Sequence, residues 1–492
     1  MRTLSSTLTS AQKSTRLDVL VKIQLTQGAN DYTYTRTRIL SITHTEEPYS
    51  QTATVILDNH DGALTALDFK GYKGVLSYGL ITSAGEEYSA CAPLYVVGQQ
   101  LNSFPGGLTC SLSLAGIPNL LDADRSVGRD GYAYTPTTAS LKTAKDTFTE
   151  IVKAVLPSRA NSTAYSLGDL VIPAVSNDYT YKCTVAGTTA SSAPTWPTST
   201  GDTVVDGTVT WKNMGVELIG FRLTPAYTPT FDSEDSLIDV FMPKDSFQIN
   251  VDGSRLEALK TLLGYTKCVM RVEADGGVHI FVPTTTGVSY DYEYKLAVAD
   301  EHNFFSKSVR TGLVIPNFIR VLNHPDHEDQ FSGSANDASS FALVPKYQTN
   351  YYRVASDAQA TAIAEAILAR LQLEAASASA SVLMNVGAEV YDYVKVTDSR
   401  ENDTKVGNIG VLTRHYRPGQ SQPWSMDFRF GRVAAGGLMG TFLSDDFEAD
   451  WDAAYDKLRD AINQIWEYLR AREETVPKLH VTKQLIIPVV PP

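Results

Sequence analysis

A short run of potential metal ligands spans residues 324–329 and reads His-Pro-Asp-His-Glu-Asp. Imidazole and carboxylate groups this close together have the chemistry to bind zinc or a similar divalent cation. Pro325 stiffens the run, however, and the run lies where a loop between two strands is expected. We therefore interpret it as a solvated loop, and we predict neither a metal site nor a cofactor for this chain.

A second group of oxygen ligands consists of Asp58, Asn59 and Asp61. Calcium prefers such ligands, but the spacing of an EF-hand loop, with its distal glutamate, is absent. The segment 58–62 has the composition of a turn, with Gly62 as its last residue. A turn is therefore expected here.

Catalytic motifs are missing from the sequence. It contains no G-x-S-x-G, no H-E-x-x-H and no Walker A loop. Carboxylates are plentiful, so a glycosidase pair stays open, yet no spacing singles one out. The glycines of Asp275-Gly276-Gly277 are typical of a hairpin turn and not of a phosphate cradle. We predict no catalytic residue and expect a non-enzymatic protein.

Aromatic residues gather in a segment, 158–215, that is rich in Thr, Ser, Gly and Pro and poor in long aliphatic residues. Ordinary globular composition resumes after Val216, which indicates a small β module inserted into a host domain. Its rings have two interpretations, either stacking on sugars or forming the core of a small domain or a protein contact, and we favour the second. The candidate carbohydrate-binding residues are Tyr165, Tyr179, Tyr181, Trp196 and Trp211.

Length and charge narrow the functional class further. The chain has 492 residues, 20% of them charged, and a formal net charge of -13. This length predicts three or four domains, and this charge excludes a non-specific grip on a phosphate backbone. Four scattered cysteines argue against a disulfide framework, and neither a signal peptide nor an apolar run of membrane-spanning length is present. We expect a soluble protein made in the cytoplasm.

Hydrophobic periodicity predicts a mainly β chain with α+β parts. Apolar residues alternate with polar ones over 17–25, and further short strands to residue 98 favour a barrel or a sandwich. Helices are expected at 144–156 and 254–264, the latter with Gly264 as a C-cap and followed by a hairpin. A second strand-rich region, 317–431, is interrupted by a long helix at 356–377.

The C-terminal part carries a heptad seam with charged residues outside it. Its mixture of isoleucine and leucine favours three strands over two. Because this terminal helix is followed by an extended apolar stretch, we favour assembly over an intramolecular helix packed on a barrel. The apolar stretch 476–492 is expected to pair with another chain. The predicted trimer-interface residues are Trp451, Tyr455, Leu458, Ile462, Ile465 and Leu469.

Several segments in this order resemble the tail-hub (baseplate-hub) proteins of tailed bacteriophages. They are the strands up to Leu67-Asp68-Phe69-Lys70-Gly71-Tyr72, the helix-and-hairpin unit 251–283, and the strand set 317–321, 407–416 and 424–431. Together they cover about three quarters of the chain. The aromatic segment resembles small carbohydrate-binding-like β modules of phage tail proteins, through Tyr165–Val171, Tyr179–Cys183, Ala193–Pro197 and Asp206–Trp211.

The resemblance implies a structural protein of the virion tail, assembled in the host cytoplasm. Three copies would form a pseudo-sixfold ring that joins the tail tube or distal tail protein to a tip or fibre protein. The tape measure protein and DNA would pass through its lumen, and a host-surface glycan is a further potential partner. The expected domains are a first hub β-barrel (1–115), a mixed α+β domain (116–157 and 216–300), the inserted module (158–215), a second hub β-barrel with a long helix (301–435), and a coiled-coil helix with an extended tail (436–492).

Two other functions remain open. The chain would be a phage carbohydrate-active enzyme if the purified protein cleaved cell-wall or capsule polysaccharide. It would be a receptor-binding tip adhesin if it bound a glycan without turnover. Neither activity is required of a hub.

Overall fold

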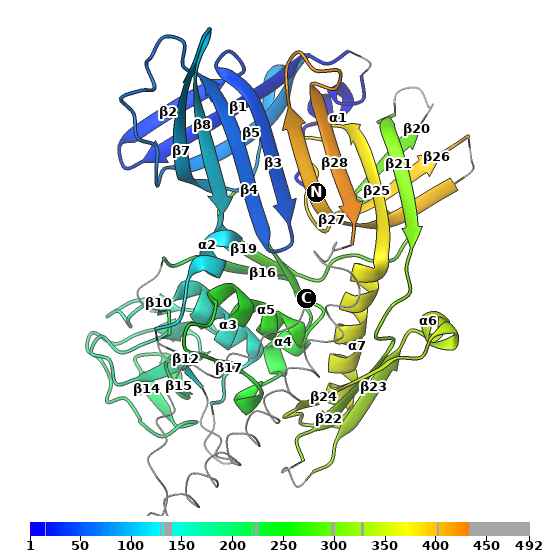
Figure 1. Ribbon diagram of the computed structural model, residues 1–492. Helices are drawn as coiled ribbons and strands as arrows, with labels where there is room; N and C mark the ends of the chain where they lie inside the picture. Colours follow the sequence, from blue (N-terminus) through cyan, green and yellow to red (C-terminus); the bar gives the residue numbers. More distant parts are fainter. Residues whose placement is uncertain are drawn as a thin grey trace, which may run out of the picture. The chain divides into compact units, whose positions relative to one another are not determined.

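The computed structural model describes residues 1–14, 16–127, 130–131, 140–218, 220–221, 225–296, 301–325, 329–400 and 403–431 (Figure 1). These residues belong to one compact unit. Among the described helices, none combines the length and apolar character that a membrane crossing requires. The predicted C-terminal coiled coil and extended tail lie outside the described residues.

The N-terminal strands form one lobe, in the hydrogen-bonded order β2-β1-β5-β7-β8-β4-β3, with β6 on β5 (Figure 1). The alternation at 17–25 is confirmed, because Val21, Ile23 and Leu25 of β1 are fully buried. A short helix, α1 (Ser6–Ala11), begins at the Ser5 N-cap. The strands are β1 (Val19–Gln27), β2 (Asn30–Thr35), β3 (Ile39–Glu47), β4 (Ser50–Asp58), β5 (Lys73–Thr82), β6 (Gly85–Ala90), β7 (Leu94–Phe104) and β8 (Gly107–Gly116).

A second strand-rich lobe comes from the C-terminal part of the described chain. Its strands run in the order β27-β28-β25-β21, and β26 joins β27 to β20. Val382 and Phe428 of this lobe belong to the same buried cluster as Val21 and Leu76 of the first lobe. One apolar core therefore supports both lobes. The strands are β20 (Tyr292–Leu296), β21 (Phe304–Thr311), β25 (Ala376–Leu383), β26 (Tyr393–Asp398), β27 (Asp403–Tyr416) and β28 (Trp424–Phe430).

Between the lobes in sequence lies a mixed α+β part with its own core. The predicted helix at 144–156 is α3 (Ala144–Lys153), which starts at a capping box of Thr143 and Asp146. The other elements are α2 (Ile117–Ala123), α4 (Leu237–Val240), the 3-10 turn η1 (Lys244–Ser246), α5 (Arg255–Gly264), β9 (Asp130–Gly131) paired with β17 (Gln248–Ile249), and the sheet of β16 (Pro229–Ser233), β18 (Val269–Val272) and β19 (Val278–Phe281).

The predicted helix at 254–264 is α5, whose N-cap is Ser254. The predicted C-cap is wrong: Gly264 is the last helical residue, and Tyr265 takes the cap position. Arginine side chains satisfy the open carbonyl groups at two helix ends instead. Arg255 donates to Ile151 and Val152 at the end of α3, and Arg370 donates to Leu263 at the end of α5. These bonds tie neighbouring helices to one another.

The long helix expected at 356–377 is α7 (Asp357–Ala375). It covers one face of a small sheet, β23-β22-β24, in which Ile319 and Val321 share a buried cluster with Ile363 of the helix. The remaining elements of this region are α6 (Ala338–Leu343), β22 (Phe318–Asn323), β23 (Ser332–Asn336) and β24 (Tyr347–Tyr352).

The aromatic segment is built of short β-strands around a small buried cluster of its own. Four of its strands pair in the order β11-β12-β15-β14, and β10 pairs with β13. Lys182 of the module binds Asp146 of α3 through both carboxylate oxygens, at 2.8 and 3.0 Å. Its strands are β10 (Ala164–Tyr165), β11 (Leu170–Val171), β12 (Tyr179–Val185), β13 (Gly187–Thr188), β14 (Thr203–Asp206) and β15 (Val209–Val216).

Candidate functional site

The junction between the two strand-rich lobes is a direct strand pairing. β3 of the first lobe and β27 of the second pair antiparallel from Leu412↔Glu46 to Tyr416↔Ile42. This pairing merges the lobes into one 14-stranded sheet. Because backbone hydrogen bonds and a common core both cross the junction, the lobes are held in a fixed relation to one another.

A buried polar cluster lies at this junction. Period-two alternation along β3 places His44 and Glu46 on the same face as buried Ile42. Arg414 of β27 stands opposite His44, is fully buried, and donates to Oε1 of Glu46 at 2.7 Å. Arg414 also donates to the carbonyl oxygen of Ala388. The ion pair therefore links the two lobes beneath the sheet surface.

Burial and neighbouring charges fix the protonation of this cluster. Burial lowers the pKa of His44 to about 4, although Glu46 opposes the shift, so the imidazole is neutral at pH 7. Burial alone would raise the pKa of Glu46, but Arg414, His44 and Arg2 outweigh it and bring that pKa to about 2. The pair thus carries one full negative and one full positive charge away from water.

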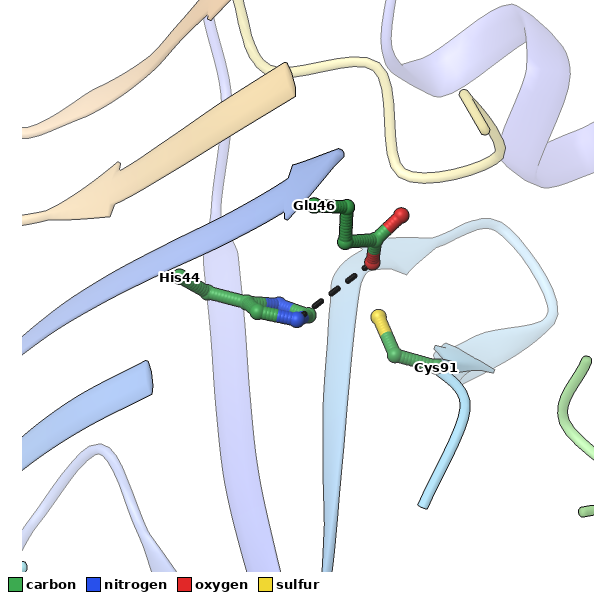
Figure 2. Close-up of side chains that lie close together, drawn as sticks. All are labelled: His44, Glu46 and Cys91. Atoms are coloured by element: carbon green, nitrogen blue, oxygen red, sulfur yellow. Dashed lines mark ion pairs between the residues drawn. The ribbon is translucent and has the colours of Figure 1, made fainter. Parts of the chain in front are cut away.

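His44, Glu46 and Cys91 come close enough to resemble a metal site (Figure 2). One ligand atom from each lies within 4.8 Å of the others, and all three residues are buried. The surroundings do not suit a cation, however. Arg414 already occupies the carboxylate of Glu46, and Arg2 adds a second guanidinium group whose charge acts on Glu46. We interpret the cluster as the polar core of the junction.

A buried ion pair also organises the inserted module. Arg159 donates through Nε and Nη2 to the two carboxylate oxygens of Asp206, at 2.8 and 2.7 Å. Asp206 further accepts from the indole Nε1 of Trp211 at 3.1 Å. Asp206 therefore joins the basic and the aromatic parts of the module's core.

The five candidate carbohydrate-binding rings occupy different environments. Tyr181 and Trp211 are fully buried, so neither ring has a free face for a sugar. Tyr165, Tyr179 and Trp196 are partly buried and pack against them. The ring centroids of Tyr181 and Trp196 are 4.3 Å apart, and those of Tyr165 and Trp211 are 5.0 Å apart. This arrangement favours the interpretation of Tyr181 and Trp211 as core residues.

The two groups of potential metal ligands from the sequence have different outcomes. The acidic turn is formed: Asp58 accepts from the backbone N–H of His60, Asp61 accepts from that of Ala63, and Asp61 also pairs with Arg38 at 2.6 Å. In the run 324–329, residues 326–328 lie outside the described residues. The predicted trimer-interface residues, from Trp451 to Leu469, lie outside them as well.

A cleft of about 140 Å³ opens where the β3–β4 turn meets α5, α7 and β27. Tyr49, Lys260, Arg370 and Tyr391 are among its lining residues, and Glu374 is the one carboxylate of that lining. Hydrolysis of a glycoside by the usual mechanism requires two facing carboxyl groups. This cleft therefore does not supply a glycosidase pair.

The sequence offered no local sign of the junction cluster. His44 and Glu46 follow the alternation of β3, but their partner Arg414 is about 370 residues further along the chain. The available signal is that a charged residue falls at a position whose face should be buried. Such a residue needs a partner, and the sequence does not say which one.

Comparisons with known proteins give structural similarity only. No family model matches the chain, and no curated protein matches its sequence. The tail protein from Neisseria meningitidis MC58 is similar with a TM-score of 0.47 and 9% identity, covering 84% of this chain and 97% of that one. The 43 kDa tail protein of prophage MuSo2 from Shewanella oneidensis is similar with a TM-score of 0.45 and 11% identity, and the match covers 84% of this chain and 98% of that one. Prophage tail protein gp18 from Listeria monocytogenes EGD-e is similar with a TM-score of 0.44 and 11% identity, and the match covers 86% of this chain and 97% of that one.

Proposed function

We propose that the chain is a structural hub subunit of a phage tail, and that three copies form a closed ring. The observation that carries this proposal is the β3–β27 pairing, which joins two strand-rich lobes into one rigid body. Three such bodies present six lobes around a threefold axis. A ring of this kind meets a sixfold tube on one side and a threefold tip on the other.

The function is mechanical in this proposal. The ring transmits the position of the tube or distal tail protein to the tip or fibre protein, while the tape measure protein and DNA pass through its lumen. Arg414 and Glu46 serve it by holding the two lobes of one subunit at a constant angle. Any glycan contact by the inserted module falls to its partly buried rings, Tyr165, Tyr179 and Trp196.

Light scattering measures the native mass that this proposal requires. We expect a trimer for the full-length chain, and a weakened trimer or a monomer for a version that ends at Gly436. A trimer that survives the truncation would keep the ring and remove the role of the coiled coil. A monomer for both proteins would refute the hub assignment, and polysaccharide cleavage would then be the activity to assay.

A further inference from the structure

The small sheet β23-β22-β24 (Figure 1) has an open face on which large apolar groups are exposed. α7 covers its other face, where Ile319 and Val321 are buried. On the open side Tyr347 and Tyr351 of β24 are 68% and 52% exposed, and Leu343 at the end of α6 is 71% exposed. All three residues fall within nine positions of the chain, on α6 and β24. Exposed apolar groups gathered in this way mark interaction sites.

The open face is ordered by contacts among its own side chains. Phe318 pairs with Tyr347 in register, and their ring centroids are 5.1 Å apart. Phe341 of α6 completes the group, at 5.7 Å from Phe318 and 5.5 Å from Tyr347. Rings that already hold one another lose little freedom when a partner covers them. The face is thus prepared for contact before binding.

A single cation stands in the middle of this face. Arg320 is exposed on the central strand, opposite Ser334 on one side and Thr349 on the other. Among the described residues, no ion pair or hydrogen bond of its side chain is found. Lys346, also exposed, lies directly before β24 and adds a second positive charge close to this face. Tyrosine and arginine are the residue types enriched at the energetically important centres of interfaces.

We infer that this aromatic face binds a second copy of the same chain, at an acidic surface of that copy. The reason is charge complementarity: Arg320 on the face and the neighbouring Lys346 are basic, whereas the chain as a whole carries a net charge of -13. Two different surfaces that meet head to tail generate a closed ring. The inference rests on the proposed trimer and identifies one of the surfaces from which that trimer is built.

Photocrosslinking of the full-length protein tests this contact. The photoreactive residue p-benzoylphenylalanine replaces Tyr347, and isotopically light and heavy chains are mixed before assembly so that mass spectrometry separates interchain from intrachain products. Leu167 of the inserted module is the matched control position, because its exposed fraction is 73%. We expect mixed-isotope crosslinks from position 347, with acceptor peptides rich in Asp and Glu, and none from position 167.

The results separate the two proposals. A protein that is monomeric by light scattering refutes the trimer, whereas a trimer without interchain crosslinks from position 347 refutes only the aromatic face. The variant Arg320→Glu is a second test, because it reverses the central charge without touching the core. We expect at least tenfold weaker association with unchanged secondary structure by circular dichroism, and unchanged association would overturn the inference.

Discussion

Replacing Arg414 by methionine should destabilise the junction between the two lobes far more than the loss of an exposed arginine would. The guanidinium group is fully buried, and the side chain of its partner Glu46 is 8% exposed. Methionine preserves most of the volume but leaves the carboxylate of Glu46 without its counter-ion. Breaking a buried pair in this way costs about 3–5 kcal/mol, because one charge stays away from water without compensation.

Arg417→Met is the matched control, since it removes an arginine three residues away on the exposed side of the same region. Arg417 donates one hydrogen bond to Thr43 at 3.2 Å. An exposed contact of this kind contributes about 0.2–1 kcal/mol. The two variants therefore separate the effect of the buried charge from that of a lost arginine side chain.

Hydrogen exchange measured by mass spectrometry provides the local readout, because unfolding of a chain of this size need not be two-state. Peptides that cover 39–47 and 403–416 report the opening of β3 and β27. We expect their protection to fall by about two to four powers of ten in Arg414→Met, and the protection of the inserted module to stay unchanged.

The double variant Glu46→Gln/Arg414→Met decides whether the buried charge is the cause. Without the carboxylate there is no uncompensated charge, so we expect the double variant to be more stable than Arg414→Met alone. A double variant whose loss equals the sum of the two single losses would refute the reasoning. A decrease of less than about 1 kcal/mol in the free energy of unfolding of Arg414→Met would also refute the reasoning.

Three further predictions concern other parts of the chain. Burial lowers the pKa of His44 from 6.5 to about 4, so on acidification the unfolded chain binds this proton before the folded chain does. The free energy of unfolding should therefore fall by about 3 kcal/mol between pH 6.5 and pH 4. Urea unfolding as a function of pH measures this fall, and His44→Gln should flatten it. Asp206→Ala leaves Arg159 buried without its partner, and limited proteolysis should then cut the module at protease concentrations that spare the native chain. Gly333→Ala places a Cβ against the backbone of α7 at Thr361 and should lower the melting temperature. Gly264→Ala, at the last residue of α5 and with open space around it, should instead raise the free energy of unfolding by about 0.4–1 kcal/mol.

The two buried ion pairs have one consequence in common. Arg414 with Glu46, and Arg159 with Asp206, each join segments that are distant in sequence. Pairs of this type contribute little net stability compared with apolar residues, but a wrong partner at the same place is costly. In a protein whose proposed role is to hold lobes at a fixed angle, we interpret them as devices that select one arrangement.

Local spacing was sufficient to predict the elements that have one buried face. The alternation at 17–25 predicted β1, and the apolar stripes predicted α3, α5 and α7, because a helix or a strand half in contact with a core repeats its apolar residues with its own period. β25 escaped prediction. Its sequence, Ala-Ser-Ala-Ser-Ala-Ser-Val-Leu, has little hydrophobic contrast, and its neighbours β21 and β28 stabilise it through backbone pairing.

Tertiary structure alone decided how distant residues meet. The sequence predicts an aromatic β module at 158–215, but only the packing shows that Tyr181 and Trp211 are the rings with no free face. Likewise, His44 and Glu46 gave no indication of Arg414, because the register of β27 on β3 depends on the whole sheet and its core. Periodicity reports which side of an element is buried; the partner on that side is set by contacts between segments, which no local pattern encodes.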